Sequence, residues 1–172
     1  MLFFLDRLIS RLFYLLLFLT PLIFWPFSSE LFEFNKIVFV YLLTAVTSAL
    51  WLIKCILAGK LIFRRTALDI PIVVFLASLG ISTILSIDVR TSLLGYYSRF
   101  HGGLLSYFSY SILYWAFVSN MGKGETKKSI FFLIASFVLV LLYGVLQHLG
   151  IDKNIWVQDV QNRIFSTLGQ PN

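Results

Sequence analysis

Residues 129–149 read SIFFLIASFVLVLLYGVLQHL, a stretch that is almost purely apolar until Gln147 and His148. A helix that crosses the hydrocarbon core of a bilayer needs about 20 consecutive, predominantly apolar residues. This stretch has that length and carries no acidic residue, lysine or arginine. It therefore predicts a membrane-spanning helix. The rest of the chain shows whether further spans are expected.

Four further apolar stretches precede it, at about Leu8–Phe27, Ile37–Leu57, Ala67–Ile87 and Gly103–Met121. The chain of 172 residues is 59% hydrophobic and only 13% charged, and its mean hydropathy is +0.87. This composition excludes a water-soluble monomer. We expect an all-α polytopic membrane protein with about five transmembrane helices, folded as a single unit over residues 1–172.

Small and polar residues within these stretches predict which faces are buried. In the second stretch, Thr44 and Ser48, and likewise Ala45 and Ala49, are four residues apart, a spacing that lets neighbouring helices approach closely. We expect that face to pack inward. The fourth stretch is the least apolar and is expected to line an interior. Its polar residues are Ser106, Ser109, Ser111, Tyr107, Tyr110 and Tyr114.

The distribution of lysine and arginine predicts the orientation in the membrane. Nine of them fall at the amino-terminal end and in the second and fourth connections between the expected spans. They are Arg7, Arg11, Lys54, Lys60, Arg64, Arg65, Lys123, Lys127 and Lys128. Five fall in the other connections and at the carboxyl-terminal end: Lys36, Arg90, Arg99, Lys153 and Arg163. By the positive-inside rule the amino terminus is cytoplasmic, and five spans then put the carboxyl end outside the cytoplasm. The net charge of +6 is explained in this way by the membrane, and nucleic acid is not expected as a partner.

The outer connection Asp88–Gly102 combines two arginines and a histidine with glycines and tyrosines. Guanidinium groups bind phosphate oxygens bidentately, and glycines let backbone N–H groups approach an anion. The connection is therefore a candidate phosphate site. A simpler alternative stays open, in which Arg99 and the tyrosines only anchor a turn to lipid headgroups.

Two short motifs in the outer segments resemble a known family. The pattern Ser86-Ile87-Asp88, Ser92-Leu93-Leu94-Gly95, Arg99 and Gly102-Gly103-Leu104-Leu105 resembles the first outer motif of the O-antigen ligase and O-antigen polymerase superfamily. Residues 163–172, RIFSTLGQPN, resemble a second motif of that family, with Gln170 where asparagine is usual. Both motifs fall on the outer face of the expected topology.

The resemblance implies an integral-membrane glycosyltransferase of the bacterial inner membrane. The donor would be a glycan linked to undecaprenyl diphosphate, and the acceptor a hydroxyl group on a glycan, lipid or protein. Arg99, Arg163, Gly95 and Gly102 would bind the diphosphate and glycan, without a metal or other cofactor. The catalytic histidine of the family lies in a large outer loop, which is expected beyond Asn172, so no catalytic residue is assigned here and residues 1–172 are expected to be the amino-terminal part of such a protein.

Three other features lead to weaker hypotheses. Glu30 and Glu33 are spaced to share a helix face and a metal ion, but carboxylates in a solvated loop are commonplace. His101 and His148 are given no catalytic role, because lone histidines near an interface are ordinary. A small permease or flippase-like carrier and a non-catalytic membrane scaffold are the alternative functions. The carrier is disfavoured, since the spans hold no ionisable residue at mid-depth by this reading.

Overall fold

The computed structural model describes residues 1–25, 30–152, 154 and 164–169. Regular secondary structure in these residues is entirely helical, which confirms the all-α prediction. The helices are α1 (Leu2–Leu19), α2 (Glu33–Ala58), α3 (Asp69–Ile84), α4 (Val89–Leu94), α5 (Leu104–Asn120) and α6 (Lys123–His148). The short α4 lies in a connection that the sequence led us to treat as a loop.

The ends of the long helices are set by local chemistry. The first helix ends at Leu19, well before the expected Phe27, and the Thr20 hydroxyl donates to the Leu16 carbonyl at 2.6 Å. Pro21 follows, and proline has no N–H to continue the helix. Helix α2 ends at Gly59, whose φ of 63° is the left-handed conformation that glycine adopts without a steric penalty.

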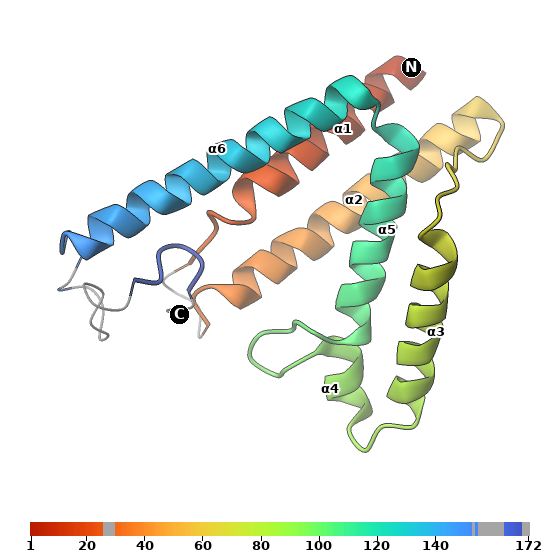
Figure 1. The fold of residues 1–172 in the computed structure, drawn as a ribbon. Helices are drawn as coiled ribbons and strands as arrows, with labels where there is room; N and C mark the ends of the chain where they lie inside the picture. Colours follow the sequence, from red (N-terminus) through yellow and green to blue (C-terminus); the bar gives the residue numbers. More distant parts are fainter. Residues whose placement is uncertain (26–29, 153, 155–163, 170–172) are drawn as a thin grey trace.

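The long helices reverse direction from one to the next along the chain, and α1, α2 and α6 are tilted relative to α3 and α5 (Figure 1). Helices α1 and α6 lie side by side and run the same way, whereas α2 and α5 run the opposite way. The amino terminus, the end of α2 and the junction of α5 with α6 therefore lie at one end, which we call the amino-terminal end. The beginnings of α2 and α5, together with α4, lie at the other, which we call the α4 end. Helix α3 packs against α5 and α4 and stands at the edge of the bundle.

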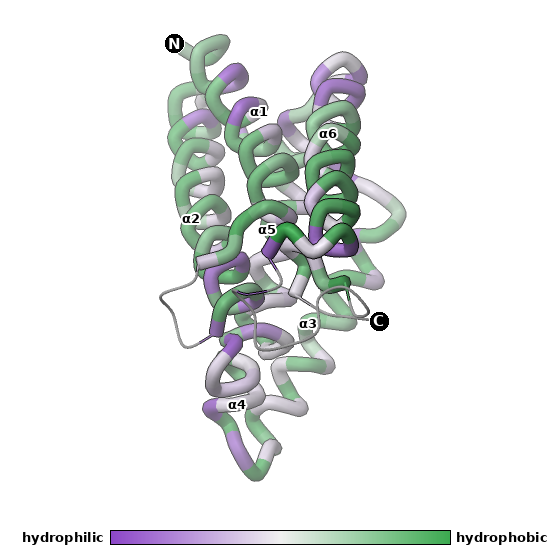
Figure 2. The backbone as a smooth tube through the Cα atoms, turned by 90° about the vertical axis from the view of Figure 1, so that its left-hand side faces the viewer, coloured by the Kyte–Doolittle hydropathy of each residue, from purple (hydrophilic) through white to green (hydrophobic). Residues whose placement is uncertain are grey.

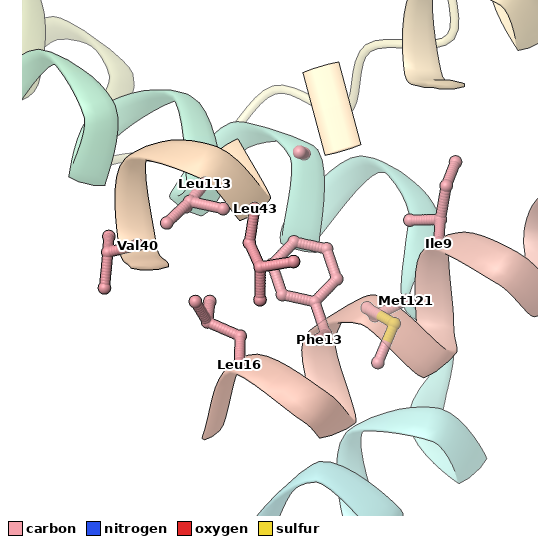
Figure 3. Close-up of a cluster of buried hydrophobic side chains, with 8 residues drawn as sticks. Ile9, Phe13, Leu16, Val40, Leu43, Leu113 and Met121 are labelled. Atoms are coloured by element: carbon pink, nitrogen blue, oxygen red, sulfur yellow. The ribbon is translucent and has the colours of Figure 1, made fainter. Parts of the chain in front are cut away.

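The core lies where α1, α2 and α5 meet (Figure 3). Phe13 of α1 is 3% exposed, and its ring meets that of Phe117 edge-to-face with centroids 5.2 Å apart. Such aromatic pairs add about 0.5–1.5 kcal/mol beyond the area that they bury. The buried apolar side chains around Phe13 are Ile9, Leu16, Val40, Leu43, Leu113, Ala116 and Met121.

Apolar residues run along most of the length of the helices (Figure 2), and many of their large apolar side chains are exposed. Helices α2 and α6, each of 26 residues, are long and apolar enough to cross a membrane, and only 28% and 17% of their most apolar windows are buried inside the molecule. The core helix of a soluble protein would bury most of that surface. Helix α1 carries three charged residues, and α3 and α5 have 16 and 17 residues. The structure thus gives two candidate spans by length and composition.

The expected small-residue face of α2 is only partly buried. Thr44 is 5% exposed, but Ala45 and Ala49 are exposed, so the prediction that the alanine pair packs inward is wrong. Helix α2 meets α1 and α5 through the neighbouring face that carries Leu43 and Thr47. In α5 the inward serines are Ser106 and Ser109, at 0% and 5% exposure, whereas Tyr107 and Tyr110 are exposed.

Lys54 ties three helices together at the amino-terminal end. Its side chain is 10% exposed, forms an ion pair with Asp6 of α1 and donates a hydrogen bond of 2.7 Å to Asn120 Oδ1 of α5. The Asn120 amide in turn donates to the Ala116 carbonyl at 2.8 Å. The charge distribution in the sequence predicts that Lys54 belongs to a connection between spans. It instead lies inside α2, one turn before the helix ends.

Replacing Lys54 with methionine is expected to lower the free energy of unfolding by about 2 kcal/mol. Removing one partner of a buried ion pair costs about 3–5 kcal/mol, whereas an exposed pair is worth about 1 kcal/mol or less. This pair lies between those limits because the Asp6 side chain is 43% exposed. The double variant Asp6→Asn/Lys54→Met leaves no unpaired charge and should recover part of the loss. Unfolding in detergent micelles measures both, and an unchanged K54M stability would contradict the prediction.

Candidate functional site

The first outer motif forms a loop that two glycines close. Gly95 has a φ of 91°, and a Cβ atom there would lie 2.2 Å from the His101 carbonyl oxygen. A Cβ atom on Gly103 would lie 2.3 Å from the Gly95 backbone nitrogen. Real Cβ atoms do not approach backbone so closely, so both positions require glycine for the two ends of the loop to touch. The Tyr96 N–H closes the loop by donating to the His101 carbonyl at 3.3 Å.

The N–H groups of the two glycines assigned to substrate binding have partners inside the chain. Gly95 donates to the Thr91 carbonyl at 2.8 Å, and Gly102 donates to Ser106 Oγ at 3.1 Å. Their residue type is explained by backbone conformation, since Gly102 also has a positive φ of 84°. A role for Gly95 and Gly102 in substrate binding stays a prediction.

Helix α4 begins with a side-chain cap from Asp88. Its carboxylate accepts hydrogen bonds from the Thr91 hydroxyl at 2.5 Å and the Thr91 N–H at 3.1 Å. These bonds lower the pKa of Asp88 below its ordinary value, so the ionised cap persists at neutral pH and is lost only as the pH falls through the lowered value. Ser86 and Ser92 add a hydroxyl pair at 2.6 Å. The Ser-Ile-Asp part of the motif therefore builds this helix.

A small pocket of about 190 Å³ lies between α4 and the loop. Its charged lining residues are Asp88 and Arg90, and the Arg90 guanidinium lies 5.4 Å from the centroid of the Tyr97 ring. Arg90 was not among the residues assigned to substrate binding. Its only signal in the sequence was that it is one of the two arginines of the Asp88–Gly102 connection.

Arg99 points away from that pocket and toward the first turn of α2. Its guanidinium pairs with the Glu33 carboxylate at 3.4 Å, and the two side chains are 48% and 30% exposed. The Phe100 ring packs against Phe34 with centroids 5.7 Å apart. The Tyr41 hydroxyl donates to the Phe100 carbonyl at 3.0 Å. The loop is thus docked on α2.

The two glutamates considered as a metal pair have separate partners. Glu33 pairs with Arg99, while Glu30 accepts a hydrogen bond of 2.6 Å from the Phe34 N–H at the beginning of α2. The interpretation of Glu33 as a merely solvated residue is corrected by its ion pair. Among the described residues, no group of three or more histidine, cysteine, aspartate or glutamate side chains is placed to hold a metal ion.

The described part of the second motif, residues 164–169, packs against α6 and the ends of α1 and α2. Ser166 Oγ donates to the Val140 carbonyl at 2.7 Å, and the Thr167 hydroxyl donates to the Pro21 carbonyl at 2.8 Å. Lys36 of α2 donates to the Thr167 carbonyl at 2.6 Å. Arg163 and residues 170–172 lie outside the described residues.

Gln147 joins this segment to the end of α6. Its side chain is fully buried, accepts a hydrogen bond of 2.7 Å from the Ser166 N–H and donates to Asp152 at 3.1 Å. The Tyr143 hydroxyl donates to the same Asp152 carboxylate at 2.6 Å. In the sequence, Gln147 is marked only as the residue that ends an apolar stretch.

Replacing Gln147 with leucine is expected to detach residues 164–169 from α6. The change keeps the side-chain size but leaves the Ser166 N–H without its acceptor, which costs about 1–3 kcal/mol for a buried group. Protease cleavage within this segment should therefore rise at least ten-fold. Leu146→Ala, at an exposed residue of the same turn of α6, is the matched control and should leave cleavage unchanged. Equal cleavage of the two variants would contradict the prediction.

The two motifs, which are far apart in the sequence, meet at the beginning of α2. Glu33 holds the first through Arg99, and Lys36, one turn later, holds the second through Thr167. Neither Glu33 nor Lys36 was predicted to do so. Of the candidate binding residues, the structure places Gly95, Arg99 and Gly102 in one loop. His101 is exposed in that loop, with its ring 6.4 Å from Tyr110.

Comparison of the chain with protein-family models, with curated protein sequences and with solved structures found no match. The chemistry of the site therefore rests on its own residues. The site has two arginines in or beside the exposed loop, Arg90 and Arg99, and a pocket next to Arg90. Both the loop and residues 164–169 are fixed to α2.

Proposed function

We propose that this chain is part of an integral-membrane glycosyltransferase that resembles the O-antigen ligases and polymerases. The enzyme would transfer a glycan from a lipid diphosphate carrier, undecaprenyl diphosphate by the resemblance, to a hydroxyl acceptor. In that reaction the acceptor oxygen attacks the anomeric carbon, the bond from that carbon to the diphosphate oxygen breaks, and a base takes the hydroxyl proton. Fixed cations stabilise the charge that develops on the leaving diphosphate.

One observation carries this proposal. Both motifs of the resemblance pack against the first turns of α2, through the Arg99–Glu33 and Lys36–Thr167 contacts. Segments that serve one active site have to be held together, and these are joined by the same helix although 57 residues separate them. The loop presents the exposed cation Arg99 and a pocket beside Arg90.

The membrane arrangement forms part of the proposal. We infer that α1, α3 and α5 cross the bilayer together with the two candidate spans α2 and α6. The alternating direction of the five helices supports this (Figure 1). The excess of lysine and arginine at the amino-terminal end supports a cytoplasmic amino terminus. The α4 end would then face the outside of a bacterial inner membrane.

The test is a transfer assay on the whole gene product reconstituted in lipid nanodiscs. The donor is a lipid-diphosphate-linked oligosaccharide, and glycan, lipid-core and peptide hydroxyl acceptors are supplied separately. We expect one acceptor to gain the glycan in step with release of the lipid diphosphate. Movement of the intact donor across vesicles without transfer would contradict the proposal and favour a carrier. Failure of every acceptor with a folded protein would favour a scaffold.

A further inference from the structure

A pocket of about 680 Å³ lies at the end of the molecule opposite to the loop. It is formed by one face of α1, by the end of α5 and by the first turns of α6, which lie beside the beginning of α1 (Figure 1). None of its lining residues belongs to the two motifs. The lining residues are Phe3, Asp6, Arg7, Ser10, Arg11, Tyr14, Asn120, Glu125 and Lys128.

The charges of this pocket favour an anion. Arg7, Arg11 and Lys128 are all exposed at the pocket and bring three positive charges. The two acidic lining residues are Asp6 and Glu125, and Asp6 is already paired with Lys54. A net positive charge therefore faces the pocket. Arginine and lysine in this arrangement are the usual partners of phosphate oxygens.

The surroundings of the pocket are apolar on the side toward the middle of the bundle. Tyr14, at the inner limit of the pocket on α1, stacks on Phe132 of α6 with ring centroids 5.1 Å apart. One helical turn beyond Arg11 lies Leu15, which is 41% exposed, and one turn beyond Lys128 lies Phe131, which is 67% exposed. The cations would contact the headgroup of a phospholipid, and the exposed apolar side chains one turn further along would contact its first methylene groups.

We propose that this pocket binds the phosphate headgroup of an anionic glycerophospholipid, with the acyl chains along the exposed faces of α1 and α6. Basic pockets between membrane helices on the cytoplasmic side are a known physical setting for such headgroups. The proposal rests on insertion of the helices in a bilayer. It does not depend on glycosyl transfer, because its measurement involves no glycan.

The experiment titrates phosphatidylglycerol into the purified whole gene product in neutral detergent and measures bound lipid by native mass spectrometry. The pocket variant is Arg7→Gln/Arg11→Gln/Lys128→Gln. Each basic residue near an anionic lipid is worth roughly a five-fold change in affinity, so we expect at least a ten-fold loss. The matched control, Lys60→Gln/Arg64→Gln/Arg65→Gln, removes the same charge from the connection between α2 and α3 and should retain binding within about two-fold.

Further arms decide between a lipid and a soluble phosphate. Inorganic phosphate at 50-fold excess, which would offset an affinity difference of about 2.4 kcal/mol, should not displace phosphatidylglycerol. Displacement would overturn the lipid assignment. Equal loss in the pocket and control variants would overturn the site. The single variant Lys128→Glu, on the exposed surface of α6, guards against misfolding of the triple variant. It should lower phosphatidylglycerol affinity at least five-fold, and unchanged affinity would again overturn the proposal.

Discussion

Replacing Arg99 with alanine in the whole gene product is expected to lower the rate of glycan transfer at least 100-fold, with the membrane abundance of the protein unchanged. A preorganised donor aimed at developing negative charge contributes about 100- to 1,000-fold to a rate. Replacing Glu33 with glutamine should lower the rate less than five-fold, because an exposed ion pair is worth only about 1 kcal/mol or less. The side chains of this pair are 48% and 30% exposed.

The comparison of these two variants separates a binding role from an anchoring role. An arginine that serves only to hold the loop against α2 would give similar, small losses in Arg99→Ala and Glu33→Gln. The same assay should test Arg90→Ala, since Arg90 lines the pocket beside the loop, and Arg163→Ala, which the resemblance implicates. Arg64→Ala, in the connection after α2, is the control and should retain full activity. Loss of protein from the membrane with activity per molecule retained would contradict the prediction.

Replacing Gly95 with alanine is expected to be the most destabilising of the changes considered, at roughly 3–5 kcal/mol for the region around the loop. A φ of 91° is strained for any residue with a Cβ atom, and the new methyl group would lie 2.2 Å from backbone of His101. Backbone cannot move aside as a flexible side chain can. The loop should therefore separate from the end of α4.

Gly102→Ala is the matched control for this prediction. Gly102 has a similar φ of 84°, but a Cβ atom there would meet nothing within 4 Å. This variant should lose only the conformational strain, about 1–2 kcal/mol. Thermal unfolding and the rate of proteolysis within residues 95–103 measure the difference. Equal destabilisation by the two substitutions would show that the contact with His101 is unimportant.

The helices could be predicted from the sequence because their signal is local. An apolar stretch such as residues 129–149 has no soluble fold that buries it easily, and each of the five stretches became a helix. Their ends were less predictable: α1 runs from Leu2 to Leu19 and not from Leu8 to Phe27. Hydropathy indicates which residues prefer the interior of a membrane. The end of a helix is instead set by local hydrogen bonds, such as that from the Thr20 hydroxyl to the Leu16 carbonyl.

Faces and partners could not be predicted, because they depend on which helix lies opposite. The four-residue spacing of alanines in α2 does not mark the packed face of the helix. That face carries Thr47, and α1 and α5 cover it. The glycines of the first motif were identified, but their closure of the loop depends on the contact between Gly95 and Gly103. The ion pair of Arg99 with Glu33 joins residues that no local pattern connects.

The sequence by itself determined that this chain is all-helical and that its cations gather at alternate connections. It predicted about five spans, and the helix lengths in the structure give two candidates. Composition and periodicity are properties of single segments, so they can be determined without knowledge of the tertiary structure. Only the tertiary structure decided that the two motifs meet on the first turns of α2, that Lys54 is buried between Asp6 and Asn120, and that a basic pocket opens between α1 and α6. Each of these depends on the packing of residues distant in the sequence, whose pairing is set by the shapes of the whole helices.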